Sequence, residues 1–475
     1  MKTHFQKMLV GASLLSGLSS AALAGQREFQ ELCEKRKEQT AIARATDAIV
    51  RELTGPFGVD KVDCAEAAAK AMTVEELNLP GSTFHYYRVS DLTPFVHLQK
   101  LKTLSLESQK IQDLTPLLQT KVKSLDLLRA EVDLSPLEQM PLETLAVTVN
   151  AEYPLKHLPQ TLRNLRISIE SSGAPRFFVG DLNGRTFYSL AIEAFGFTDS
   201  NGNRGKLEIE GLDRVGRAHL QLEGVKVGAE DIGISFTRSL VLKNVEIMNV
   251  ELLKLNLDTY SVVIQNSGLK NVDFLKTIPG SMYLMHLDLS GNDFSAQEAL
   301  IGLKEVPRLE SLILRESKVT YMREISNLFR LKRLEITKAR SLSFLLIEDL
   351  RHLEKLIVEE SGLSHFDSKE GTFPKLKELS LRRNLFSTAR FINSHTMPNL
   401  VKLDISDNGI GSVKTLSALA SLETLELDGN RVTDLSPLVG LKNLKHLSAT
   451  RNALGTEAVC PIQGLERCNV SNQAD

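Results

Sequence analysis

The chain contains no tryptophan, and aromatic residues make up only 5% of its 475 residues. Antibody-like surfaces depend on Tyr and Trp, which offer large, rigid contact areas. The scarcity of these residues is unusual for such a surface or for a carbohydrate-binding one. It is natural for a core packed mainly from leucine.

An excess of charge of one sign is also absent, because 57 basic residues face 59 acidic ones. A nearly neutral chain has no global field that attracts nucleic acid or an acidic membrane. We therefore expect no nucleic-acid partner, and any selectivity must come from local patches.

Long hydrophobic runs are missing, apart from residues 8–18, which follow Lys2 and Lys7. This run contains Gly and Ser and is too short for a bilayer core of about 30 Å. The small residues of Ala22-Leu23-Ala24 suit a cleavage site, so residues 1–24 are predicted to be a signal peptide. A retained membrane anchor is the alternative. No Cys lies directly after the cleavage site to take a lipid, and no hydrophobic tail ends the chain. We therefore expect an exported, soluble protein without membrane insertion, periplasmic or extracellular.

Cysteine is rare, and its four positions cluster near the two ends of the chain. Exported proteins can keep disulfides. We predict pairs between close neighbours, Cys33 with Cys64 and Cys460 with Cys468, since a long array separates the ends. Free thiols or a metal site are the alternatives, but the spacing lacks the paired C-x-x-C pattern of zinc sites.

Leucine, in contrast, recurs with a period of about 20 to 25 residues, in about sixteen copies of an apolar-x-apolar core. The copies are Leu104/Leu106, Leu125/Leu127, Leu145/Val147, Leu165/Ile167, Leu190/Ile192, Leu220/Leu222, Leu240/Leu242, Val262/Ile264, Leu287/Leu289, Leu312/Leu314, Leu334/Ile336, Leu356/Val358, Leu379/Leu381, Leu403/Ile405, Leu425/Leu427 and Leu447/Ala449. Alternation of this kind turns two side chains inward and one outward, as a short strand requires. Because one unit cannot bury its apolar face alone, the units must stack, with their strands forming a parallel sheet.

An asparagine follows five of these strands, always five residues beyond the first strand leucine. These residues are Asn292, Asn384, Asn408, Asn430 and Asn452. We expect their inward amides to satisfy backbone groups in the turn that leaves the sheet, which an apolar side chain could not do.

These motifs resemble the leucine-rich-repeat family, and specifically its short-repeat bacterial class typified by internalins. The resemblance rests on Leu104-Ser-Leu106 running to Asp113-Leu-Thr-Pro116, and on Leu425-Glu-Leu427 running to Asp434-Leu-Ser-Pro437. It implies an α/β solenoid, a horseshoe with a parallel β-sheet on the concave face, a short helical, 3₁₀ or irregular convex side and a small α-helical N-terminal cap. Asp can cap, and Pro can open, a short helical turn on the convex side.

The repeat covers residues 80–458 and is irregular around 168–254, where Glu170, Val225 and Val245 occupy the Asn position. Either an inserted loop at 177–205 or sequence drift explains this irregularity. Residues 25–79 are predicted to be a helical cap, with one helix over 28–53 ended by Thr54-Gly55-Pro56 and another over 63–72. Residues 459–475 are predicted to close the other end.

Catalytic signatures are absent in their required context: a metalloprotease His pair, a Gly-x-Ser-x-Gly elbow, a P-loop and a dinucleotide fingerprint. His219, His286 and His446 precede strand leucines in distant repeats and cannot share a metal. Asp199, Asn201, Asn203 and Glu210 have calcium-loop spacing, but Arg204 takes the place of the loop glycine, so a polar turn explains them better. We expect no enzyme activity, no metal and no cofactor.

Outward strand positions provide the candidate site, because equivalent residues of successive repeats form columns on the concave face. We predict an apolar centre with charged flanks, as is common in protein-binding patches. The candidate partner-binding residues are Val241, Val263, Asp288, Ile313, Arg315, Arg333, Glu335, Lys355, Ile357 and Arg382, with Glu208, Glu210 and Glu223 expected to form an acidic group beside them. The alternative is that β-branched residues merely suit strands and alternating charges keep the face soluble.

The preferred function is recognition of a protein, or a glycan, outside the cytoplasm through a rigid concave surface. The family resemblance implies adhesion or recognition at a cell surface. A periplasmic scaffold of the cell envelope is the alternative. An enzyme carried on the repeats would need a catalytic domain, for which the segment after the last repeat is too short.

Overall fold

The computed structural model describes most of the chain between residues 20 and 470. The described residues are 20–38, 40–54, 62–79, 89–130, 132–149, 155–169, 176–194, 206–210, 212–232, 237–255, 257–277, 283–339, 342, 350–365, 373–455 and 459–470. The chain divides into two compact units, Met1–Leu207 and Glu208–Asp475. The calcium-like loop at 199–203 lies outside the described residues.

Three helices open the first unit: α2 (Ser20–Glu34), α3 (Ala41–Thr54) and α4 (Cys64–Ala71). The predicted single helix over 28–53 is wrong, because the chain breaks between α2 and α3, where the Thr40 hydroxyl accepts a hydrogen bond from the Ala43 amide at 3.1 Å. The helix predicted over 63–72 is confirmed, with Asp63 as its N-cap. Cys33 and Cys64 form the predicted disulfide between α2 and α4.

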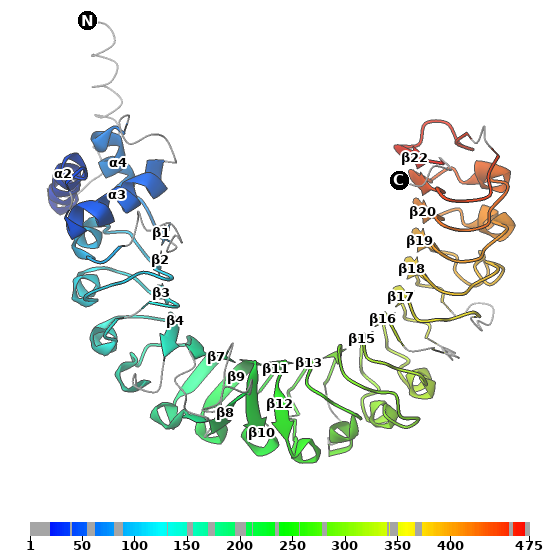
Figure 1. The fold of residues 1–475 in the computed structure, drawn as a ribbon, viewed down its shortest axis with the longest axis horizontal. Coiled ribbons are helices and arrows are strands. Elements are labelled where there is room, and N and C mark those ends of the chain that lie inside the picture. Colours follow the sequence, from blue (N-terminus) through cyan, green and yellow to red (C-terminus); the bar gives the residue numbers. More distant parts are fainter. Residues whose placement is uncertain are drawn as a thin grey trace, which may run out of the picture. The chain divides into compact units, whose positions relative to one another are not determined.

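Parallel strands follow, one in each coil, on the concave side of the first unit (Figure 1). They are β1 (Glu76–Asn78), β2 (Thr103–Ser105), β3 (Ser124–Leu127), β4 (Thr144–Val149), β5 (Asn164–Ile169) and β7 (Thr186–Ala194). The first strand, β1, pairs with β2, so the sheet starts inside the segment predicted as the cap. The predicted Leu residues of adjacent strands lie side by side in the register of this sheet, as Leu104 and Leu125 do.

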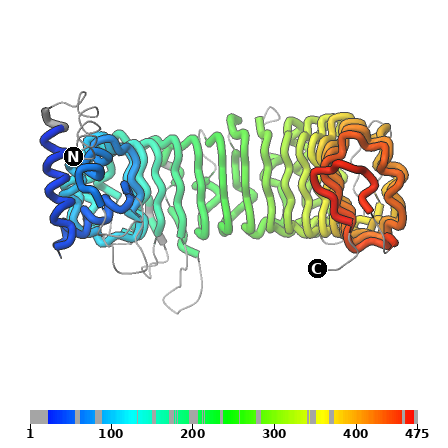
Figure 2. Tube along the Cα trace, turned by 90° about the horizontal axis from the view of Figure 1, so that it is seen from above, coloured from blue at the N-terminus to red at the C-terminus, as the bar shows by residue number. Residues whose placement is uncertain are grey.

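The second unit continues the same plan, and Figure 2 shows its coils stacked side by side. Its main-sheet strands are β9 (Gly216–Glu223), β11 (Ser239–Lys243), β13 (Ser261–Gln265), β14 (His286–Asp288), β15 (Ser311–Arg315), β16 (Arg333–Thr337), β17 (Lys355–Glu359), β18 (Glu378–Ser380), β19 (Lys402–Asp404), β20 (Thr424–Glu426), β21 (His446–Ser448) and β22 (Arg467–Asn469). The last strand carries Cys468, which forms the predicted disulfide with Cys460. The C-terminal closing segment therefore adds one more strand to the sheet.

Most described turns that leave the main sheet have a left-handed residue four positions after the first apolar strand residue, although β4, β5 and β7 still continue as strands at that position. Examples are Glu316, Lys338 and Gly429, at φ 53°, 53° and 66°. Ser317 and Ala339 follow Glu316 and Lys338, but where an Asn follows, as Asn430 follows Gly429, it satisfies the turn as predicted. The Asn430 amide donates to the carbonyls of Ile405 and Leu427, both at 2.9 Å, and its oxygen accepts from the Ile410 amide at 3.0 Å. One buried side chain thus joins two successive coils.

Short 3₁₀ helices lie on the side opposite the sheet, and several begin at the predicted Asp-x-Ser/Thr-Pro motif (Figure 1). In η4 (Thr115–Gln119) and η14 (Ser436–Gly440) a Pro lies in the first turn. Asp113 and Asp434 each accept a hydrogen bond from the amide two residues ahead, at 2.8 Å. The predicted role of the Pro is confirmed, whereas the Asp lies one residue before the N-cap, which is Leu114 or Leu435, and bonds to the first helical residue.

The irregular middle keeps the predicted concave strands but replaces the Asn turn with extra strands. In the second unit, β10 (Val225–Gly228) and β12 (Glu246–Met248) pair in parallel and, with β8 (Leu207–Glu210), belong to a second, smaller sheet. Val225 and Val245 are fully buried. An apolar residue can take the Asn position here because sheet hydrogen bonds satisfy the following backbone.

Candidate partner-binding face

The predicted column of outward residues exists in the second unit. Across β11 to β17 the parallel register aligns Val241 with Val263, then Asp288, Ile313, Glu335 and Ile357. The residues on either side of each member, such as Val262 and Ile264 beside Val263, are fully buried. The strands therefore hold the column outward by packing its neighbours into the core.

The aliphatic members of this column are partly exposed on the open face. Val241, Val263, Ile313 and Ile357 are half-buried, in contrast to the inward leucines of the same strands. Covering this surface with a partner would contribute about 25 cal/mol for each Å² of apolar area removed from water, before the entropic costs of association are subtracted.

Glu335 differs from the sequence expectation of an accessible charge, since only 1% of it is exposed. Both of its oxygens are held by arginines of the same face. Arg333 donates to one oxygen through Nε at 2.8 Å, and Arg315 donates to the other. Alternation along the strand correctly predicts that the Glu335 side chain points outward, but the side chains of Arg315 and Arg333 cover its carboxylate. Glu335 therefore positions Arg315 and Arg333 and cannot itself contact a partner.

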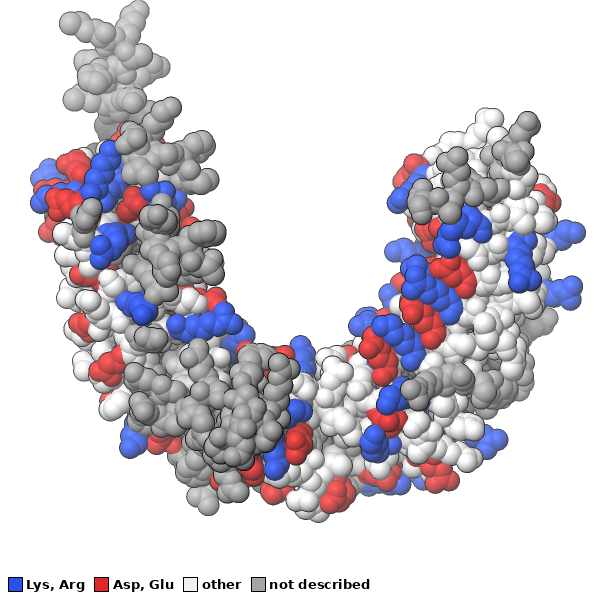
Figure 3. Space-filling model, viewed as in Figure 1, with Lys and Arg blue, Asp and Glu red and all other residues white. Residues whose placement is uncertain are grey.

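The remaining basic residues of the face also have acidic neighbours. Lys355 Nζ lies 2.8 Å from Glu378 Oε1, and Arg382 Nε lies 3.5 Å from Asp407 Oδ2. In Figure 3 basic and acidic side chains alternate along this part of the second unit. The flank of the column is thus charge-balanced internally.

The predicted acidic group of Glu208, Glu210 and Glu223 is not a single group. Glu223 lies on β9 of the main sheet, whereas Glu208 and Glu210 lie on β8 of the smaller sheet. Glu208 Oε2 lies 3.6 Å from Lys226 Nζ on β10. The prediction placed Glu208 and Glu210 wrongly because apolar and polar residues alternate in β8 as in a concave strand, although β8 belongs to the smaller sheet.

Asp404 and Glu426, which sequence reasoning missed, continue the column beyond Ser380. With Arg382, Asp407 and other polar residues they line a hollow of about 310 Å³. Burial, together with Asp428 and Asp404, raises the pKa of Glu426. The signal that finds Asp404 and Glu426 is the same position in each repeat, followed past Ile357.

An exposed apolar edge beside the column was also missed. Tyr260 and Met285 lie directly before β13 and β14, are 39% and 37% exposed, and are hydrogen-bonded through their backbones. Nearby, Tyr283 is 52% exposed and stacks with Arg308, whose guanidinium carbon is 4.8 Å from the ring centre. In later repeats the same position carries paired charges such as Glu310 and Lys332, at 2.8 Å. The apolar surface is therefore wider beside β13 and β14.

The histidines lie where the sequence placed them, on separate strands: His219 on β9, His286 on β14 and His446 on β21. Within the described ranges, no three His, Cys, Asp or Glu side chains gather in a way that could hold a metal ion. No described helix is long and apolar enough to cross a membrane.

Comparison with known sequences supports the repeat assignment. Residues 374–432 match the sequence model of the leucine rich repeat. The fold is a leucine-rich-repeat solenoid. This fold is typical of protein-binding modules, which present an extended curved surface. No curated protein sequence matches the chain.

Solved leucine-rich-repeat structures resemble the chain at low sequence identity. An internalin from Listeria monocytogenes is 17% identical, with 83% of this chain and 92% of that chain covered and a TM-score of 0.37. A leucine-rich-repeat protein from Leptospira interrogans is also 17% identical, with 83% and 94% covered and a TM-score of 0.39. TLR13, solved in complex with ssRNA13, is 19% identical, with 78% and 59% covered and a TM-score of 0.48. These similarities concern the fold alone.

Proposed function

We propose that this protein is an exported recognition module that binds a protein through the concave face of its second unit. The observation that carries the proposal is the column of Val241, Val263, Ile313 and Ile357, held in register and half-buried on the open face of the sheet. The predicted signal peptide and the two disulfides support an extracytoplasmic location.

The charges beside the column favour a protein over a polyanion. A nucleic acid is bound by cations that exchange small counterions for phosphates. Here Arg315 and Arg333 are engaged by the buried Glu335, and Lys355 by Glu378. An apolar centre surrounded by paired charges matches the usual anatomy of a protein interface.

Adhesion to another cell and recognition of a soluble ligand would both use this surface. The location of the protein distinguishes these two functions from that of a periplasmic envelope scaffold. Expression of the full chain, followed by fractionation and N-terminal sequencing, tests export. A mature protein that starts at Gly25 in the surface or medium fraction supports recognition of other cells. A chain that keeps residues 1–24 in the cytoplasm contradicts the proposal.

The binding face is tested by cross-linking pull-down from cell-envelope and host-surface extracts with the exported protein and with a Val263→Ser, Ile313→Ser variant. Val439→Ser is the matched control, since Val439 is 60% exposed on η14, on the opposite side of the solenoid. A protein partner retained by the wild type and the control, and lost by the folded double variant, supports the proposal. Equal recovery by all three proteins contradicts it.

A further inference from the structure

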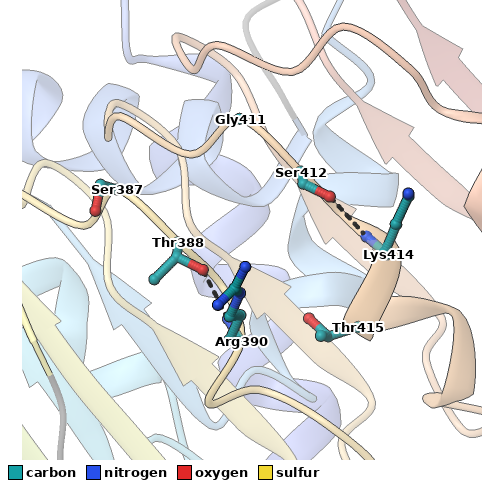
Figure 4. Close-up of a pocket in the computed structure, with 7 residues that line it drawn as sticks. All are labelled: Ser387, Thr388, Arg390, Gly411, Ser412, Lys414 and Thr415. Carbon is teal, nitrogen blue, oxygen red and sulfur yellow. Dashed lines mark hydrogen bonds between the residues drawn. The ribbon is translucent and has the colours of Figure 1, made fainter.

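A second surface of the same unit, away from the main-sheet strands, forms a polar pocket of about 430 Å³ (Figure 4). It lies between the two coils that follow β18 and β19. Its lining residues are Ser387, Thr388, Arg390, Gly411, Ser412, Lys414 and Thr415. Four of them carry hydroxyl groups, two carry positive charges, and none carries a carboxylate or an aromatic ring.

The pocket occupies the place where regular repeats carry an aspartate just before the 3₁₀ helix. In the repeat of β20, Asp434 lies nine residues after the first strand leucine, and it accepts hydrogen bonds from Ser436 through both the amide and the hydroxyl, each at 2.8 Å. At the same position in the repeats of β18 and β19 the chain has Thr388 and Ser412. The carboxylate of the regular repeat is thus replaced by a hydroxyl, twice in succession.

The residue two positions after this aspartate position is changed as well. Where the regular repeat has Ser436, these two repeats have Arg390 and Lys414. The turn itself is kept, because the Arg390 amide donates to Thr388 Oγ1 at 3.3 Å and the Lys414 amide to Ser412 Oγ at 3.4 Å (Figure 4). Two neighbouring repeats therefore retain the turn and exchange a negative charge for a positive one.

Both cations are available to a ligand. Arg390 and Lys414 are exposed, and neither side chain forms an ion pair with a carboxylate of the described residues. Lys414 is close enough to Asp434 of the next repeat to lower the pKa of that carboxyl, but Asp434 is already held by Ser436. In contrast, the basic residues of the concave face are paired with acids, as Lys355 is with Glu378.

We propose that this pocket binds the phosphate group of a phosphorylated sugar. Two cations match the charge of a phosphate monoester, and both can donate charge-assisted hydrogen bonds to its oxygens. The hydroxyls of Ser387, Thr388 and Ser412 can donate to sugar hydroxyls, whereas the Thr415 hydroxyl, which donates to the Ala389 carbonyl at 3.0 Å, can only accept. The volume falls in the range of small-molecule sites, which is about 300 to 1,000 Å³. Without an aromatic platform, an uncharged sugar would lack an anchor.

Isothermal titration calorimetry of the full-length exported protein at low salt tests the proposal, with glucose 6-phosphate, glucose and inorganic phosphate as probes. We expect glucose 6-phosphate to bind more tightly than inorganic phosphate, and glucose not to bind. A variant that restores the regular repeat in both coils combines Thr388→Asp, Arg390→Ser, Ser412→Asp and Lys414→Ser. It should fold, because Asp434 and Ser436 form this same turn in the next repeat. Its affinity for glucose 6-phosphate should fall by at least about tenfold for each cation removed.

Two further variants sharpen the test. Arg390→Gln with Lys414→Gln removes the charges without adding acids, and should also lose at least about tenfold in affinity. Lys442→Ala removes an exposed lysine outside the pocket and should bind like the wild type. The proposal is overturned if no probe binds, if glucose binds as tightly as its phosphate, if inorganic phosphate binds as tightly as glucose 6-phosphate, or if the cation-free variants bind like the wild type.

Discussion

The second unit contains two kinds of coil that solve the same problem in different ways. Where the chain leaves the sheet, inward-facing carbonyls need donors. In the regular coils a buried Asn provides them, as Asn292 does for the carbonyls of Ile264 and Leu289, at 2.6 and 2.8 Å. In the coil of β9, Val225 takes the Asn position and a second sheet forms.

The irregular coil also uses a buried arginine. Arg217 on β9 is 1% exposed and donates to the carbonyls of Val215 and Asp231, both at 2.7 Å, and of Ile232 at 3.1 Å. Burial lowers its pKa to about 10. Like Asn292, it joins one coil to the next, here through η8 (Leu212–Arg214) and α5 (Ala229–Ile232). Arg217 thus supplies buried donors in a coil that lacks the Asn, although the coil of β16, with Ala339 at the Asn position, shows that such a side chain is not present in every coil.

Among the predicted changes in stability, the one caused by replacing Arg217 should be the largest. Arg217→Leu leaves several buried carbonyls without a donor, and we expect the free energy of unfolding to fall by about 3 to 4 kcal/mol. Urea denaturation followed by circular dichroism measures the change. Arg217→Lys, which keeps the charge but not the forked geometry, should lose less. Arg330→Leu, at an exposed arginine, is the control. An unchanged midpoint for Arg217→Leu would show that the second sheet alone holds these coils.

Asn292→Leu tests the regular solution. It removes donors to the carbonyls of Ile264 and Leu289 and the acceptor for the Ser267 and Leu269 amides, which lie at 3.1 and 3.0 Å. We expect a loss of about 2 to 3 kcal/mol in the same denaturation experiment. Asn327→Leu, at an exposed position of η12 (Arg323–Asn327), should change little. If both variants lose equally, the buried amide does not stabilise the turn.

Val225→Asn asks whether the two solutions are interchangeable. Gly224 and Gly291 have nearly the same left-handed φ, 69° and 72°, so the turn begins alike in both coils. The backbone after Val225 belongs to β10, however, so a new amide would be buried without matching partners. We expect a loss of about 2 kcal/mol by urea denaturation, against almost none for Val439→Asn on the exposed η14. A gain in stability would mean that Asn suits either coil.

The same contrast explains which features the sequence predicts. Apolar pairs such as Leu240 and Leu242 place every main-sheet strand from β2 to β21, even in the irregular middle, because the alternation is local and repeats; β1 and β22 lie outside the predicted repeats. The Val at position 225 indicates only that the Asn is missing. The second sheet and the burial of Arg217 depend on how neighbouring coils pair, which no single repeat encodes.

The candidate site likewise has features that a single repeat encodes and features that depend on contacts between coils. The register of the Val263 and Ile313 column comes directly from the repeat. The burial of Glu335 does not, because it arises when Arg315 and Arg333, each accessible by alternation, converge on one carboxylate. The hydroxyls and cations of the polar pocket are visible in the sequence only once the Asp-x-Ser pattern of the other repeats is aligned with Thr388-x-Arg390.

The smallest predicted effect concerns the regular end of the column, where acids replace the aliphatic residues. Burial, then Asp428 and Asp404, raises the pKa of Glu426 in the folded protein. The folded state therefore binds this proton more tightly than the unfolded state, so ionisation of Glu426 destabilises the fold as pH rises above the ordinary glutamate value. Glu426→Gln should raise stability at pH 7 by less than about 1 kcal/mol, since the group is partly solvated. The gain should vanish at acidic pH, where Glu426 is protonated in both states.

Glu423→Gln is the contrasting variant, because it breaks the ion pair with Lys445 at 2.7 Å and should not stabilise the protein. A loss of stability for Glu426→Gln at pH 7 would mean that Arg467 or His446 holds the carboxylate, and that this end of the face is organised by ion pairs in the same way as Glu335.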